Sequence, residues 1–130
     1  MNYIVKTGFS NMQIDDIYRL LHTSYWAQDR SREAMIKSME NSLCFGVFDG
    51  EKQIAFARVF SDYVTTYYLC DIIVDSGYRG QGIGKQLVGY IVEYPDLQSL
   101  KGVLGTKDAH DLYRQFGFQS ADENMMIRKR

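Results

Sequence analysis

A run of glycines and basic residues directly after an apolar stretch holds the clearest chemistry in this sequence. The run Arg79–Lys85 has glycine at every second position from Gly80 to Gly84 and follows the apolar segment 69–74. Apolar residues then recur at helical spacing from Ile83 to Tyr94, which predicts a helix that begins within the glycines. The first amides of a helix lack internal acceptors and lie at the positive end of its dipole, so this turn predicts a phosphate-binding site.

The spacing of the glycines excludes two common phosphate-binding motifs. A nucleotide-kinase loop would need lysine after Gly82, but Ile83 follows. The dinucleotide fingerprint is one residue short between its second and third glycines. The pattern that fits is Arg-x-x-Gly-x-Gly, with Arg79, Gly82 and Gly84. After an apolar strand, this pattern resembles the acyl-coenzyme A (acyl-CoA) loop of the GNAT superfamily of N-acetyltransferases.

The resemblance implies acetyl-CoA as co-substrate, with its pyrophosphate on the glycine run. It also implies that a backbone amide near Ile73 or Val74 polarises the thioester carbonyl. The predicted cofactor-binding residues are Ile73, Val74, Arg79, Gly80, Gln81, Gly82, Ile83, Gly84 and Lys85.

The elements needed to position this loop can be read along the whole chain. Ser10 with Gln13 predicts a capping box at the start of a first helix, and Asp49-Gly50 predicts a hairpin turn. The predicted strands are 2–7, 43–48, 53–60, 65–74, 100–105 and 125–128, and the predicted helices run from 10 to 22, 31 to 40, 83 to 94 and 108 to 116. This order is also that of the GNAT superfamily. It implies an α/β (α+β) fold with a mixed, mostly antiparallel sheet of six to seven strands, about four flanking helices, and a splay between the fourth and fifth strands at the acetyl-CoA site.

Length and composition bound the classes of function. The 130 residues suit one domain, expected to be an N-acetyltransferase domain over 1–130, and the formal net charge is −1. This charge gives no basis for binding nucleic acid or a membrane surface. No membrane-spanning run or signal-peptide core is present, so we expect a cytoplasmic protein without a disulfide. Two histidines and two separated cysteines show no metal-ligand spacing, so no metal is expected.

A tyrosine in the last predicted helix is a candidate general acid. The segment 112–118 resembles the Tyr-x-x-x-Gly-Phe segment of the superfamily, in which the tyrosine protonates the departing thiolate, and Tyr113 matches it. An unperturbed phenol has a pKa of about 10 and can donate at neutral pH.

Asp71 is the second candidate catalytic residue, because a carboxylate within the apolar strand 67–74 is costly without a partner or a task. Three readings remain open: a general base, an ionised group that holds the substrate ammonium, or a structural carboxylate. The resemblance here is to glucosamine-phosphate acetyltransferases, in which the matching aspartate lies in the acceptor site. Thr66 and Tyr68 stand where histone-type members have a glutamate base, so a water chain remains an equal alternative to Asp71.

The region between the first two helices is the expected acceptor site. The resemblance places Tyr25, Trp26, Arg30 and Arg32 where family members gate the acceptor. Aromatic rings suit an amine, and arginines suit a carboxylate or phosphate. We take Tyr25, Trp26 and Arg32 as predicted substrate-binding residues.

The sequence therefore predicts transfer of an acetyl group from acetyl-CoA to a primary amine of a small molecule, by direct attack in a ternary complex. Two alternatives remain, a peptide or protein N-acetyltransferase and a non-catalytic acyl-CoA sensor or assembly module. An exposed sheet edge makes a homodimer a further expectation.

Overall fold

The structure is a computed structural model, and it describes residues 3–121 and 124–129. Its centre is one twisted sheet in the order β1-β2-β3-β4-β5. The strands are β1 (Ile4–Thr7), β2 (Leu43–Asp49), β3 (Lys52–Ser61), β4 (Thr66–Val74) and β5 (Lys101–Leu104). Neighbouring strands are antiparallel from β1 to β4, whereas β5 runs parallel to β4.

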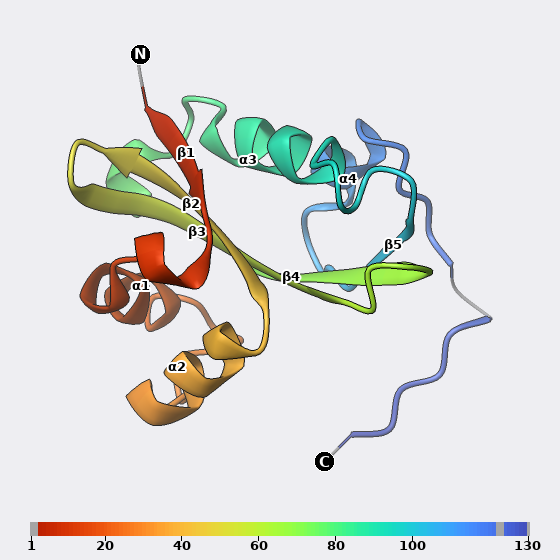
Figure 1. Cartoon of the computed structure of the whole chain (residues 1–130), viewed down its shortest axis with the longest axis horizontal. Coiled ribbons are helices and arrows are strands. Elements are labelled where there is room, and N and C mark those ends of the chain that lie inside the picture. The colour runs from red at the N-terminus through yellow and green to blue at the C-terminus, as the bar shows by residue number, and fades with distance from the viewer. Residues whose placement is uncertain (1–2, 122–123, 130) are drawn as a thin grey trace.

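Helices cover both faces of the sheet (Figure 1). On one face lie α1 (Ile14–Leu21) and α2 (Arg32–Glu40), and on the other lie α3 (Ile83–Val92) and the short α4 (His110–Arg114). Each face has its own apolar cluster. Phe45, Val47 and Leu69 pack with the α3 side chains, while Phe48, Phe56 and Ile73 pack with α1 and α2. None of the described helices is long and apolar enough to cross a membrane.

The predicted sheet of six to seven strands is too large, because the described residues form five. The segment 125–128, predicted as a closing strand, has no regular structure, and its Met126 and Ile127 side chains are 95% and 82% exposed. A short apolar run becomes a strand only where a partner edge and a packing surface receive it. Among the described residues this run pairs with no strand, and its side chains are exposed.

The start of the first helix also differs from the prediction. Ser10 lies in a 3-10 turn and α1 begins at Ile14, with Gln13 as N-cap and no capping side chain. The buried Gln53 on β3 takes that role from a distance, since its Oε1 accepts the Gln13 N–H at 2.9 Å. The backbone N–H of Gln53 in turn donates to the Asp16 carboxylate on α1. The N-terminus of α1 is therefore held by β3 rather than by its own sequence.

A bulge in the middle of β4 reverses which residues face which helices. Asp71 has a φ of 55°, and the pairing of β3 with β4 shifts register between Phe56 and Arg58. Before the bulge Leu69 faces the α3 side, and after it Ile73 faces the α1 and α2 side. A left-handed residue at an extra strand position produces this reversal. As a result, the Asp71 carboxylate meets arginines from the α1–α2 loop and from β3.

Candidate active site

The glycine turn before α3 leaves a set of backbone amides open. Gly80 and Gly82 have φ of 81° and 78°, and Gly82 is the N-cap of α3 without any side-chain cap. The first hydrogen bond of the helix runs from the Gln86 amide to the Gly82 carbonyl. The amides of residues 83–85 therefore have no acceptor among the described residues.

The surroundings of these amides can accommodate a diphosphate. A Cβ built on Gly80 or Gly82 would meet no atom within 4 Å, so the space in front of the turn is open. Ile83 is buried and fixes the helix to the core, whereas the Lys85 ammonium is exposed beside the turn. Arg79 is also exposed, and its Nε donates to the Val74 carbonyl at 3.3 Å. Unfilled amides at the positive end of a helix, with two cations beside them, form an anion site.

Asp75 holds the turn that leads into these glycines. Its Oδ1 accepts the Gly77 amide at 2.9 Å, and its Oδ2 pairs with Arg19 on α1 at 2.9 Å and with Lys52 at 3.9 Å. The Gly77 hydrogen bond, followed by Arg19, keeps the pKa of this buried carboxyl below its ordinary value of 3.8. The charged form is therefore the one that the folded state prefers.

We expect Asp75→Asn to lower the melting temperature at neutral pH by about 2–4 °C, because asparagine keeps the acceptor for Gly77 but loses the attraction of Arg19 and Lys52. A lowered pKa in the folded state adds stability above the unfolded value of about 3.9, and this stability disappears as the pH falls through the folded pKa. Thermal unfolding at successive pH values should thus show the gap between wild type and variant closing below about pH 4. A gap of constant size would show that the charge does not contribute.

The edge of β4 is open on the side that leads to this turn. β5 pairs only with Thr66–Leu69, so the half of β4 from Cys70 to Val74 has no strand on its β5 side among the described residues. β3 continues along the other side to Val74. The predicted splay between the fourth and fifth strands corresponds to this opening.

The register of β4 shows which predicted amide faces the opening. The Asp75 amide donates to the Ile54 carbonyl of β3. Hydrogen-bonded and non-hydrogen-bonded pairs alternate in an antiparallel ladder, so Ile73 also directs its amide toward β3. The amides of Val74 and Ile72 then point to the open edge. Of the two predicted residues, Val74 is placed to offer its N–H there, and Ile72, which the sequence analysis did not name, joins it.

Tyr113 on α4 packs beside the α3 cluster with its hydroxyl available. Its ring meets Phe118 edge to face, with centroids 6.0 Å apart. Gly117, with a φ of 88°, allows the chain to turn back so that the Phe118 amide reaches the Tyr113 carbonyl. Burial, and then the negative charge of Asp108, raise the pKa of Tyr113 above 10. The hydroxyl has no hydrogen-bond partner among the described residues and is not sealed in the interior, so it keeps its proton and can donate it.

Asp71 is held by two arginines. Arg30 donates two hydrogen bonds to its carboxylate, from Nη1 to Oδ2 at 2.6 Å and from Nη2 to Oδ1 at 3.3 Å. Arg58 donates a third, from Nε to Oδ2 at 2.9 Å. The Asp71 side chain is only 5% exposed. Both oxygens accept hydrogen bonds from charged N–H donors. Of the three roles left open by the sequence, this arrangement favours that of a structural carboxylate. Its predicted catalytic role stays a prediction.

The loop between α1 and α2 lines a cavity of about 680 Å³ next to Asp71. Tyr25 and Trp26, which the sequence analysis predicts to bind the substrate, are on its wall, and Lys107 lies over the Tyr25 ring at 5.5 Å. Arg32 is not on the wall, since it pairs with Asp15 and lies over Tyr18 on α1. Arg32, predicted to bind the substrate, therefore lies on the outer surface, where it pairs with Asp15.

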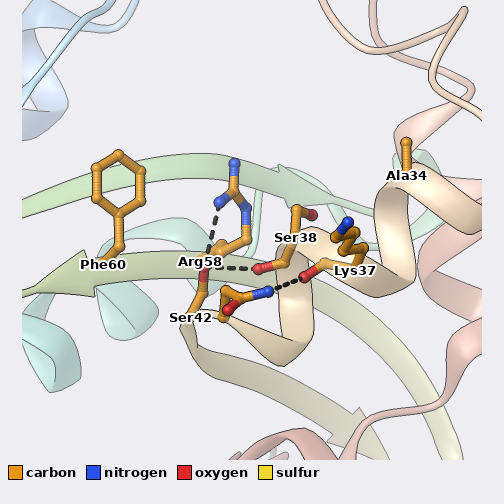
Figure 2. A pocket seen from close by; sticks show the side chains of 7 residues that line it. Ala34, Lys37, Ser38, Ser42, Arg58 and Phe60 are labelled. Carbon is orange, nitrogen blue, oxygen red and sulfur yellow. Dashed lines mark hydrogen bonds between the residues drawn. The ribbon is translucent and has the colours of Figure 1, made fainter.

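Arg58 is a charged residue of the site that the sequence analysis missed. It lines this cavity and also a neighbouring hollow of about 570 Å³ between α2 and β3 (Figure 2). The signal was present, because Arg58 is a lone cation inside an apolar strand, as Asp71 is a lone anion inside the next one. Such groups are costly unless they meet, and the hairpin of β3 and β4 brings them together.

The two cysteines are unsuited to nucleophilic attack. Burial raises the pKa of Cys44 to about 12 and that of Cys70 to about 11, with Asp71 adding to both shifts. A thiol must ionise to attack a thioester, so both remain largely unreactive at neutral pH.

Comparison with known proteins agrees with the fold. The Acetyltransferase (GNAT) family matches residues 11–118, and the chain belongs to this family. A solved acetyltransferase of the GNAT family from Xanthomonas campestris pv. campestris, described as putative, is 38% identical over 99% of this chain and 94% of its own, with a TM-score of 0.93. A probable acetyltransferase from Staphylococcus aureus is 25% identical over 97% of this chain and all of its own, with a TM-score of 0.77.

Curated relatives include longer proteins. The Arabidopsis thaliana protein named GCN5-related N-acetyltransferase 2, chloroplastic, is 28% identical over 127 residues, which are 92% of this chain and 48% of that protein. The chain spans about half the length of this relative and of a soybean histone acetyltransferase that it also matches. Membership of the family indicates acetyl transfer in general.

Proposed function

We propose that this protein transfers the acetyl group of acetyl-CoA to a primary amine of a small molecule, by direct attack within a ternary complex. The observation that supports the proposal most is the open edge of β4 from Cys70 to Val74. The turn that follows this edge leads to the unfilled amides of residues 83–85. An extended pantetheine chain fits beside a strand edge, and a diphosphate fits at a helix start.

Each part of the site then has a task. Acetyl-CoA supplies the acetyl group as a thioester. The amides that begin α3, with Arg79 and Lys85, hold the diphosphate, and the Val74 or Ile72 amide donates to the thioester carbonyl oxygen as negative charge develops there. Tyr113 donates its proton to the sulfur as the carbon–sulfur bond breaks.

The proton lost by the amine goes to water in this proposal. Both Asp71 oxygens accept from arginines, so the carboxylate is better placed to orient Arg30 and Arg58 than to take a proton. The new carbon–nitrogen bond forms directly, because neither cysteine offers a thiolate for an acyl-enzyme.

The test combines titration calorimetry with acetyl-CoA and assays of thiol release against a panel of amines. Binding with amine-dependent thiol release is the expected result, and release with small amines but not with peptides supports the small-molecule acceptor. Preference for peptides would overturn that part of the proposal. Binding without release from any amine would favour the sensor, and absence of binding would contradict the cofactor site itself.

A further inference from the structure

Arg58 is shared by the two cavities on the α1 and α2 side of the sheet. The cavity of about 680 Å³ lies under the α1–α2 loop, and the hollow of about 570 Å³ lies between α2 and β3. Ala34, Ser38 and Arg58 line both, so the two spaces adjoin along this side of α2. Each volume lies in the range of small-ligand sites.

The guanidinium of Arg58 has one nitrogen left for a ligand. Its Nε donates to Asp71 and its Nη1 donates to the Ser42 hydroxyl at 3.2 Å. Nη2 has no partner among the described residues, and it is not sealed from solvent. The Arg58 side chain is 14% exposed, so this nitrogen acts from a largely dry position, where a charged hydrogen bond is strong.

Positive charge exceeds negative charge around this nitrogen. Asp71 is shared between two arginines, which leaves one guanidinium charge uncompensated. Lys37 adds a second, exposed cation on the wall of the hollow, while Asp29 is the one acidic residue among the described residues that line the two cavities. Figure 2 shows the Ser38 side chain between the Lys37 ammonium and the Arg58 guanidinium in this view. The site is cationic in a chain of net charge −1.

An apolar wall completes the hollow. Phe60 is 44% exposed, stacks on Tyr68 with centroids 5.1 Å apart, and lies under Arg58 at 5.7 Å. This ring offers a flat face to the carbon skeleton of a ligand whose charged end lies at Arg58 and Lys37.

We propose that the acceptor carries an anionic group, a carboxylate or a phosphate, which Arg58 and Lys37 bind in the hollow between α2 and β3. The amine at its other end then lies under the α1–α2 loop beside the bulge of β4. This inference rests on the proposed function and adds to it the chemical class of the acceptor.

Matched pairs of amines test this inference. One arm compares β-alanine and its longer homologues with their amides, and the other compares phosphoethanolamine and its longer homologues with the corresponding amino alcohols. At the best chain length we expect kcat/KM to be on the order of 10- to 100-fold higher for the anionic member, from a charged hydrogen bond in a sheltered site. The two arms distinguish carboxylate from phosphate.

Two substitutions and one control locate the effect. Arg58→Lys keeps a charge beside Asp71 but removes Nη2, and we expect it to lower kcat/KM about tenfold for the anionic acceptor only. Lys37→Met is an exposed change that should fold normally, and we expect a loss of about threefold. Lys6→Met removes a cation from β1, at the far edge of the sheet, and should leave the preference unchanged.

The outcomes separate this inference from the proposed function. Equal or faster turnover of the neutral amines would overturn the anionic acceptor and leave acetyl transfer intact. If no amine is acetylated, calorimetry with the same pairs of amines in the presence of CoA tests the anion site directly. Tighter binding of the anionic member, weakened by Arg58→Lys, supports the anion site, and equal binding overturns it.

Discussion

Replacing Tyr113 by phenylalanine is expected to lower kcat by about 10²- to 10⁴-fold, the usual contribution of a positioned general acid. The phenylalanine ring keeps the edge-to-face contact with Phe118, so the fold and the affinity for acetyl-CoA should stay the same. Only the proton for the departing sulfur is lost. Thiol-release assays give kcat, and titration calorimetry gives the affinity.

Tyr94→Phe is the matched control. Tyr94 packs against the same apolar cluster, burial raises its pKa too, and it lies two residues beyond the C-terminal end of α3. The Tyr94→Phe variant should turn over acetyl-CoA at the wild-type rate. A Tyr113→Phe variant within about threefold of wild type would show that water or another group protonates the sulfur.

The pH profile gives an independent view of the same group. The pKa of Tyr113 is raised from 10 because burial and Asp108 disfavour the phenolate. A general acid works below its pKa, so Tyr113 should cause no loss of kcat on the alkaline side up to about pH 10.

Replacing Gly82 by alanine is expected to weaken acetyl-CoA binding by about 10- to 100-fold. The added methyl group would stand in the open space before the α3 amides, where it keeps a diphosphate from making one or more charged hydrogen bonds. The φ of 78° also strains alanine by about 1–2 kcal/mol. Calorimetry with acetyl-CoA measures the first effect and thermal unfolding the second.

Gly50→Ala separates strain from obstruction. Gly50 has a φ of 62° in the hairpin of β2 and β3, and a Cβ there would likewise meet nothing within 4 Å. Both variants should lose similar stability, but only Gly82→Ala should lose affinity for acetyl-CoA. Equal affinities in the two variants would show that the start of α3 does not bind the cofactor.

The Asp71 bulge links the two halves of the proposed site. The same residue that reverses the facing of β4 also binds Arg30 and Arg58 at the wall of the proposed acceptor cavity. Removing either arginine would leave a buried carboxylate short of a partner, which is costly. The ion pairs therefore connect the position of the α1–α2 loop with the geometry of the strand edge.

The features that the sequence predicted correctly depend on local backbone chemistry. Gly82 must adopt a positive φ at the start of α3, Gly50 must do so in the Asp49-Gly50 turn, and Gly117 must do so after α4. Glycine alone satisfies these positions without strain, so single residues and their immediate neighbours determined them. The helices α2 and α3 and the five strands of the sheet begin and end within two residues of their predicted bounds.

The features that only the tertiary structure decided depend on partners far away in the chain. Gln53, forty residues later, caps α1 in place of the capping box predicted at Ser10. Met125 to Arg128 has the composition of a strand but pairs with no strand of the described sheet. Composition and spacing do not encode which distant group arrives, because that depends on strand register and packing.

Asp71 shows, within one residue, which features the sequence determined and which the tertiary structure decided. The sequence by itself determined that a carboxylate in an apolar strand needs a partner or a task. The structure decided which partners, since Arg30 lies 41 residues away and Arg58 lies 13 residues away on the next strand. The φ of 55° turns the side chain toward them. A one-residue bulge changes the face of every later residue in the strand, so the position of Asp71 and the surroundings of Arg58, the proposed anion site, depend on the folded sheet.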